Sequence, residues 1–142
     1  MPVGRHDRHR PAIHKILKTW LALTVLASIP AESAVAASKP VPLTVVMVDN
    51  RFIPDHIEFS AGVRYRLRLE NRGKDLHEFT APEFFAAAKV TNRRVLANGG
   101  KEVVVQPHEA AVVDLVAPKP GTYALTCADH DWDGMVGQIV VR

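Results

Sequence analysis

The chain has 142 residues, of which 47% are hydrophobic and 23% are charged, and this composition fits one soluble globular domain. Its formal net charge is +3, but five Lys and Arg residues and only two acids lie in residues 1–36, which leaves 13 residues of each sign in the rest. The body of the chain is therefore neutral, and we expect no nucleic-acid partner.

The N-terminal segment has the three parts of a secretory signal peptide. Residues 1–18 are basic, residues 19–29 form a short apolar run, and Ala34-Val35-Ala36 offers the small residues of a cleavage site. The apolar run is shorter than the ~20 residues that span a bilayer, although an uncleaved anchor or an amphipathic helix is the alternative. We predict a signal peptide over residues 1–36 and a domain over residues 37–142. The mature protein is expected to be periplasmic or otherwise exported, and not membrane-spanning.

Short β-prone segments separated by turn residues recur along the mature chain, which is the pattern of an all-β domain. The clearest is 63–70, where apolar and charged residues alternate as in a half-buried antiparallel strand. The one helical stretch is 82–90, which opens with Pro82. We predict a Greek-key β-sandwich of about seven or eight strands with one short helix. The predicted strands are 43–48, 56–60, 63–70, 76–80, 101–106, 110–116, 122–127 and 135–141.

Three arginines, Arg64, Arg66 and Arg68, fall on the polar side of the alternating segment. They could form a docking patch for an acidic partner, or simply a solvated sheet face. We favour the solvated face, because charged side chains are ordinarily exposed.

One stretch near the C-terminus carries metal-binding side chains at a fixed spacing. Cys127, His130 and Met135 form the pattern Cys-x2-His-x4-Met between two predicted strands. With 7 His and 3 Met in 142 residues, chance gives both offsets after a Cys about once in a thousand sequences. Thiolate, imidazole and thioether together suit copper, since sulfur favours Cu(I) and nitrogen favours Cu(II). Cys127 is the one Cys of the chain, so an internal disulfide does not explain it.

A blue-copper arrangement also needs a second histidine from elsewhere in the chain. His56, His77 and His108 are the candidates in the mature chain. His77 begins a predicted strand, which can hold it rigidly, whereas His56 and His108 lie beside prolines in turn-like segments and are expected to be exposed.

The predicted site is therefore one copper ion held by His77, Cys127, His130 and Met135. Met47 is an alternative axial ligand, but it lies inside an early strand without the loop spacing.

These segments resemble those of the cupredoxins, especially the small plastocyanin-like and pseudoazurin-like proteins. Residues 121–130 are similar to their G-x-Y-x-x-x-C-x-x-H segment, and residues 135–137 to their M-x-G. Residues 71–77 resemble the segment that supplies the first histidine, and residues 50–54 with Gly62 match an N-terminal F-x-P…G pattern. The resemblance covers nearly all of residues 43–142. It implies a Greek-key sandwich, one type 1 copper and one-electron transfer.

The sequence departs from this family in two places. Glu78 follows the first histidine where plastocyanin-like proteins usually carry an Asn that steadies the Cys loop. Glu78 could take over that role or approach the metal as an oxygen ligand, which would disfavour blue copper. The loop also carries Asp129, Asp131 and Asp133 where the family usually has an apolar patch. These acids are either simply solvated, or they lower the reduction potential and favour a partner with a basic docking face.

We expect an exported, monomeric one-electron carrier that exchanges electrons with a redox partner protein. The alternative is a periplasmic copper-handling protein that delivers or buffers copper, since the same ligands permit both roles. An enzyme is not expected, because multicopper oxidases and nitrite reductases usually need His-x-His pairs, which the mature chain lacks. A cysteine hydrolase with His130 as the base is disfavoured by the tight spacing from Cys127.

Overall fold

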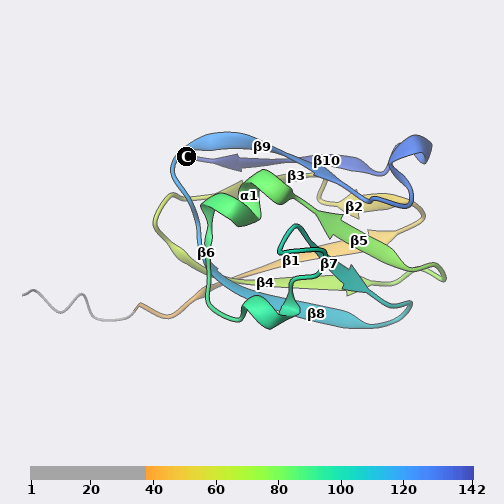
Figure 1. Cartoon of the computed structure of the whole chain (residues 1–142), viewed down its shortest axis with the longest axis horizontal. Helices are drawn as coiled ribbons and strands as arrows, with labels where there is room; N and C mark the ends of the chain where they lie inside the picture. Colours follow the sequence, from red (N-terminus) through yellow and green to blue (C-terminus); the bar gives the residue numbers. More distant parts are fainter. Residues whose placement is uncertain (1–37) are drawn as a thin grey trace, which may run out of the picture. The chain divides into compact units, whose positions relative to one another are not determined.

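The computed structural model describes residues 38–142, which form two five-stranded sheets packed face to face (Figure 1). Neighbouring strands are antiparallel except for the parallel pairs β1–β4 and β3–β10. Sheet A has the spatial order β2 (Arg51–Ile53), β1 (Val41–Val48), β4 (Arg64–Asn71), β8 (Ala110–Val116) and β6 (Lys89–Val90). Sheet B has the order β3 (His56–Phe59), β10 (Val136–Val141), β9 (Gly121–Thr126), β5 (His77–Thr80) and β7 (Glu102–Val105). The predicted all-β sandwich is confirmed.

The predicted signal peptide lies outside the described residues and stays a prediction. Within residues 38–142, no helix is long and apolar enough to cross a membrane. The helices of this range are the α-helix α1 (Pro82–Ala87) and two 3-10 turns, η1 (Arg93–Val95) and η2 (Asp131–Asp133).

The structure adds two short strands to the predicted set and shortens the predicted helix. β2 has three residues and β6 has two, too few for a periodic pattern to be visible in the sequence. The helix stops at Ala87 because Ala88 is extended, with ψ of 148°, and leads into β6. Val90 pairs with Leu115 of β8 and is buried, so core packing outweighs the local helical preference of the alanine run.

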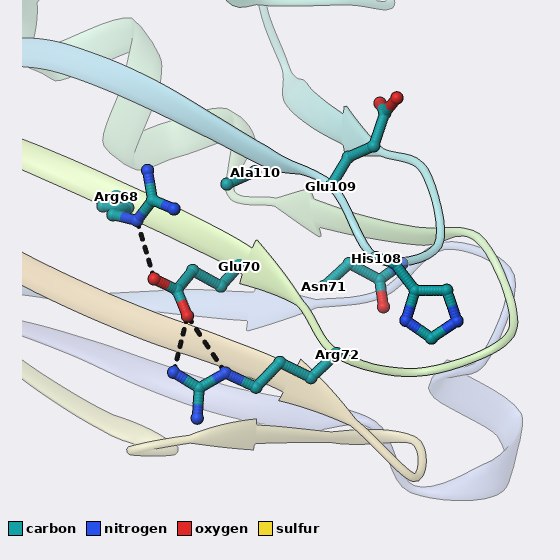
Figure 2. A pocket seen from close by; sticks show the side chains of 7 residues that line it. All are labelled: Arg68, Glu70, Asn71, Arg72, His108, Glu109 and Ala110. Carbon is teal, nitrogen blue, oxygen red and sulfur yellow. Dashed lines mark hydrogen bonds and ion pairs between the residues drawn. The ribbon is translucent and has the colours of Figure 1, made fainter.

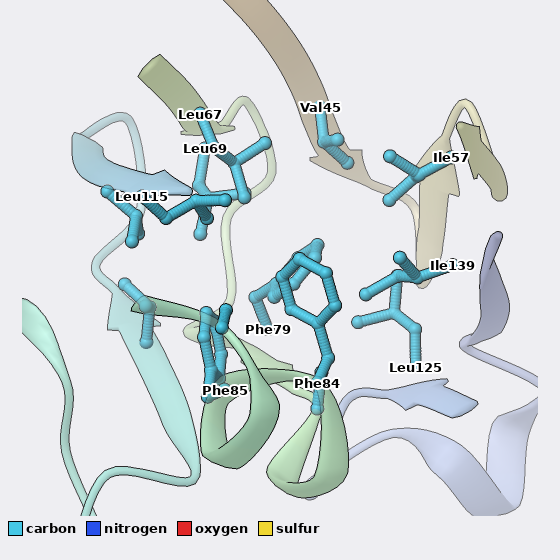
Figure 3. Close-up of a cluster of buried hydrophobic side chains, with 14 of the residues drawn as sticks. Val45, Ile57, Leu67, Leu69, Phe79, Phe84, Phe85, Leu115, Leu125 and Ile139 are labelled. Carbon is cyan, nitrogen blue, oxygen red and sulfur yellow. The ribbon is translucent and has the colours of Figure 1, made fainter. Parts of the chain in front are cut away.

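The core lies between the two sheets and follows the alternation of their strands (Figure 3). On β4, Tyr65, Leu67 and Leu69 are buried while the arginines between them are exposed, as predicted. Helix α1 adds Phe84 and Phe85, both fully buried. Phe84 packs against the rings of Phe59 and Tyr123, and Phe85 packs against Phe79. The helix therefore joins the core between the sheets. Each of its aromatic pairs stabilises the fold beyond what the buried apolar area alone contributes.

The arginines on the outer face of β4 are largely paired with acids of the same face. Glu70 accepts hydrogen bonds from both Arg68 and Arg72 beside a surface pocket that His108 also lines (Figure 2). The bonds from Arg68 and Arg72 lower the pKa of Glu70. Arg66 is bound in the same way to Asp114. This internal pairing agrees with a solvated sheet face.

Candidate metal centre

The loop between β9 and β10 is held in shape by its own backbone. Cys127 N–H donates to the carbonyl of Met135 at 3.0 Å, and Met135 N–H donates to the carbonyl of His130 at 3.0 Å. η2 closes the tip, where His130 accepts from Asp133 N–H at 3.1 Å. Side chains along β9 point alternately to the two faces of the sheet, so Leu125 and, two positions later, Cys127 both point into the core and are buried. The loop thus directs its thiol into the sandwich, at the end drawn on the right in Figure 1.

His77 reaches the same end of the sandwich from β5. The preceding loop is fixed by Asn71, whose buried amide donates to the carbonyls of Asp75 and Val105 and accepts from Gly73 N–H. A side chain at Gly73 would crowd this imidazole, because its Cβ would lie 3.2 Å from Nε2 of His77. The loop backbone therefore packs directly against the imidazole and leaves Nδ1 to face the thiol.

Three of the four predicted ligands converge. The Sγ atom of Cys127 lies 3.9 Å from Nδ1 of His77 and 3.4 Å from Nδ1 of His130. The ligand atoms of the three residues all lie within 4.8 Å of one another, and this is the one such group found in residues 38–142. Two ligands of one ion, with bonds of about 2.3 Å to sulfur and 2.0 Å to nitrogen, would lie about 3.5 to 3.7 Å apart. The spacing therefore fits a single metal ion bound by one thiolate and two imidazoles.

The other residues considered from the sequence lie as follows. Met135 is fully buried at the base of the loop, and its backbone bonds to both Cys127 and His130. His56 and His108 are exposed and belong to no such cluster in the described residues. Met47 is buried on β1, in sheet A.

Burial sets the electrostatics of the metal-free cluster. Desolvation raises the pKa of the Cys127 thiol to about 11, and its hydrogen bond to Glu78 acts in the same direction. Desolvation also lowers the pKa of His77, and the neighbouring His130 adds to this effect. At neutral pH the metal-free site is thus a protonated thiol beside a neutral His77 imidazole. A soft cation must displace only the thiol proton to gain the sulfur ligand.

Two side chains outside the ligand set hold the loop. Glu78 accepts the thiol hydrogen of Cys127 at 3.0 Å and the N–H of Asp129 at 3.3 Å. On the other side, Nδ2 of Asn50 donates to Oδ2 of Asp133 at 2.6 Å. Sequence reasoning identified Glu78 as a departure from the family pattern, but it missed Asn50. No local pattern could reveal that contact, since 83 positions separate the two residues.

The surface over the cluster is acidic around one large aromatic side chain. His130 is half-buried, whereas His77 is buried. Trp132 is 80% exposed, although its indole N–H donates to the carbonyl of Asp129 at 2.8 Å. Asp129, Asp131 and Asp133 are all exposed around it. His130 is thus the ligand candidate nearest to solvent.

The fold and the cluster together define a class of β-sandwich proteins with a buried thiol, one buried imidazole and one half-buried imidazole gathered at the loop end. The family model described as a cupredoxin-like domain matches residues 17–141, and the chain belongs to this family. The predicted resemblance to cupredoxins is confirmed, and the predicted copper cofactor agrees with both the family and the donor set.

Solved structures share the fold at low sequence identity. Auracyanin B is 20% identical with a TM-score of 0.57, over 74% of this chain and 91% of that chain. Auracyanin A, described as a "blue" copper protein of Chloroflexus aurantiacus, is 18% identical with a TM-score of 0.55, over 73% and 100%. The auracyanin of Roseiflexus castenholzii is 15% identical with a TM-score of 0.56, over 74% and 99%. No curated protein matches the chain in sequence.

Proposed function

We propose that this protein is an exported one-electron carrier in which His77, Cys127, His130 and Met135 hold a single copper ion. The observation that carries the proposal is the convergence of two imidazole Nδ1 atoms on the buried Cys127 thiol. When bound, copper would supply a Cu(I)/Cu(II) couple that takes up and releases one electron.

The residues around the cluster fit such a role because they hold the ligands before any metal binds. The His77 imidazole is fixed by the Asn71 loop, and the Cys127 loop is fixed by its backbone bonds. Burial of Cys127 and Met135 keeps water from the sulfur ligands. Preorganised ligands do not need to move when the metal changes oxidation state. Electron transfer then carries little reorganisation energy and is fast.

The loop surface supports a partner with a basic docking face. Electrons would pass through the half-buried His130, and the nearby exposed acids Asp129 and Asp131 would attract positive charge. The exposed Trp132 offers an apolar contact beside them. The signal-peptide pattern of residues 1–36 supports export, and the partner is therefore expected outside the cytoplasm.

A nucleophilic role for Cys127 has less support, although His130 lies 3.4 Å away. Reactive cysteines are partly exposed and have lowered pKa values. Cys127 is fully buried, and its pKa is raised to about 11. We therefore infer a ligand and not a nucleophile.

Reconstitution of residues 37–142 with Cu(II) tests the proposal. Intense visible absorption from copper-thiolate charge transfer is expected in the wild-type protein and should vanish in Cys127→Ser. His108→Ala serves as the control, since His108 is exposed and lies outside the cluster.

A second measurement separates electron transfer from copper handling. Reversible voltammetry with fast self-exchange would support the role of an electron carrier. Transfer of the copper to an acceptor chelator, without reversible voltammetry, would favour copper handling instead. A colour that persists in Cys127→Ser would overturn the ligand set.

A further inference from the structure

Glu78 is a buried carboxylate on the opposite side of β5 from its neighbour His77. Its strand partner is Val104, which is exposed on the outer side of sheet B. Glu78 is nevertheless only 6% exposed. No ion pair to a Lys, Arg or His is found for it within residues 38–142. A carboxylate that is buried without a cation is costly unless other groups satisfy it.

The groups that satisfy Glu78 all belong to the loop of the metal cluster. One oxygen, Oε2, accepts both the thiol hydrogen of Cys127 and the N–H of Asp129. The backbone N–H of Glu78 donates to the same sulfur atom at 3.4 Å. The residue thus contacts the sulfur with both its backbone and its side chain, and it ties down the loop two positions further on.

Glu78 does not share the position of a ligand. The group of ligand atoms that lie within 4.8 Å of one another contains His77, Cys127 and His130, and it does not include the Glu78 carboxylate. The carboxylate therefore touches the sulfur without joining the histidine nitrogens around a common centre. This arrangement argues against the alternative in which Glu78 is an oxygen ligand.

We propose that Glu78 is a positioning residue that pins the Cys127 loop and, because its carboxylate side chain offers the ligand sulfur an acceptor and no donor, favours the oxidised state of bound copper. This inference rests on the copper site proposed above. Acceptors beside a thiolate leave its electron density available to the metal, which stabilises Cu(II). A donor in the same place would withdraw that density and stabilise Cu(I).

Two substitutions separate the two parts of this role. Glu78→Gln replaces the carboxylate, whose Oε2 makes both contacts, with an amide that after a small rotation accepts from Asp129 N–H through its oxygen and donates to the sulfur through its NH2. We expect its loop to stay fixed and its reduction potential to shift upward. Glu78→Ala removes the anchor altogether, and we expect copper to be lost to a chelator at least tenfold faster. The matched control is Glu102→Gln, because Glu102 is also buried on sheet B but bonds to Thr80 instead of the loop.

A metal-free measurement makes the test independent of the copper chemistry. Hydrogen exchange of the Asp129 amide, followed by NMR in the apoprotein, should be slow in the wild type and in Glu78→Gln but fast in Glu78→Ala. Unchanged exchange in Glu78→Ala, or a potential in Glu78→Gln that moves no more than in Glu102→Gln, would overturn the inference. If the wild type forms no copper-thiolate band while the exchange pattern holds, the copper function fails and the anchor remains. A band of a different copper class in Glu78→Gln would instead mark Glu78 as a ligand and overturn the positioning role.

Discussion

Asn50 illustrates how one side chain outside the ligand set can hold the metal loop. It occupies a two-residue turn between β1 and β2 with φ of 53°, and it bonds to Asp133. Glycine adopts this conformation readily, so Asn50→Gly removes the bond and keeps the turn. We expect copper release to accelerate severalfold while the free energy of unfolding falls by about 1 kcal/mol or less. Chelator-competition kinetics and chemical denaturation measure the two quantities.

A matched control for Asn50 exists elsewhere in the chain. Asn98 also has a positive φ, 48°, but it lies in the turn before β7. Asn98→Gly should leave copper release unchanged. Equal acceleration in both variants would show that the Asn50 bond has no specific effect on the loop.

The buried thiol of Cys127 predicts a pH dependence of the apoprotein. Its pKa is raised from 9.0 to about 11, so the unfolded chain loses the thiol proton at a lower pH than the folded protein does. The contribution to stability is complete below the unfolded value of 9.0 and is lost as the pH rises through about 11. We expect the free energy of unfolding to fall by about 2 to 3 kcal/mol at most across this window. Urea titrations of Cys127→Ala at the same pH values provide the baseline, and a parallel decline in that variant would contradict the assignment.

At the scale of single residues, the sequence predicts what depends on spacing and chemical type. Cys127 and His130 stand out because three side chains suited to copper follow one another at fixed intervals, and His77 because it begins a strand. The contacts of Asn50 and Glu78 could not be predicted in detail. They join residues 83 and 49 positions apart, and their geometry exists only once the sheets have packed.

Among the elements, the pairing of β3 with β10 depends on a close approach at Gly137. A Cβ at this position would lie 2.6 Å from the carbonyl oxygen of Asp55, which also accepts the N–H of Gln138 at 2.7 Å. We expect Gly137→Ala to destabilise the protein by roughly 2 to 4 kcal/mol, because the two backbones must separate at the edge of sheet B. Thermal and chemical denaturation of the apoprotein measure this loss.

Gly121→Ala is the control for Gly137, because it lies at the start of β9, where the nearest atom to an added Cβ is 3.4 Å away. Alanine there should be neutral or slightly stabilising, since it restricts the unfolded chain. If both alanine variants lose the same stability, the close approach at Asp55 is not the cause.

Element prediction succeeded where the pattern was long and failed where tertiary packing decided. The alternation over 63–70 corresponds to β4, an eight-residue strand that pairs with β1 on one side and with β8 on the other. The helix was predicted three residues too long, because the alanine run favours a helix while burial of Val90 beside β8 requires an extended chain. β2 and β6 are too short to show a period, so only the sheet itself reveals them.

Across the whole molecule, the charges of the neutral body are segregated. Arg66 and Arg68 on the outer face of β4 are paired with Asp114 and Glu70, whereas the exposed acids of the metal loop form no ion pairs within the described residues. The loop end therefore carries the less compensated charge. The rate of association through this end should therefore depend on salt more strongly than the zero net charge of the domain suggests.

This asymmetry predicts the salt dependence of electron self-exchange between two copies of the copper protein. Two copies that meet through their His130 ends bring like charges together, so the rate should be slow at low ionic strength and should rise as salt screens the repulsion. In the double variant Asp129→Asn/Asp131→Asn the low-salt rate should increase and its salt dependence should flatten. Asp133 is left in place because it accepts the bond from Asn50.

The control for this prediction is the double variant Glu58→Gln/Glu83→Gln. It removes two charges from β3 and α1 instead, and it should behave as the wild type. NMR line broadening in mixtures of the two oxidation states measures the rate, and a wild-type rate indifferent to salt would mean that the copies meet through another face.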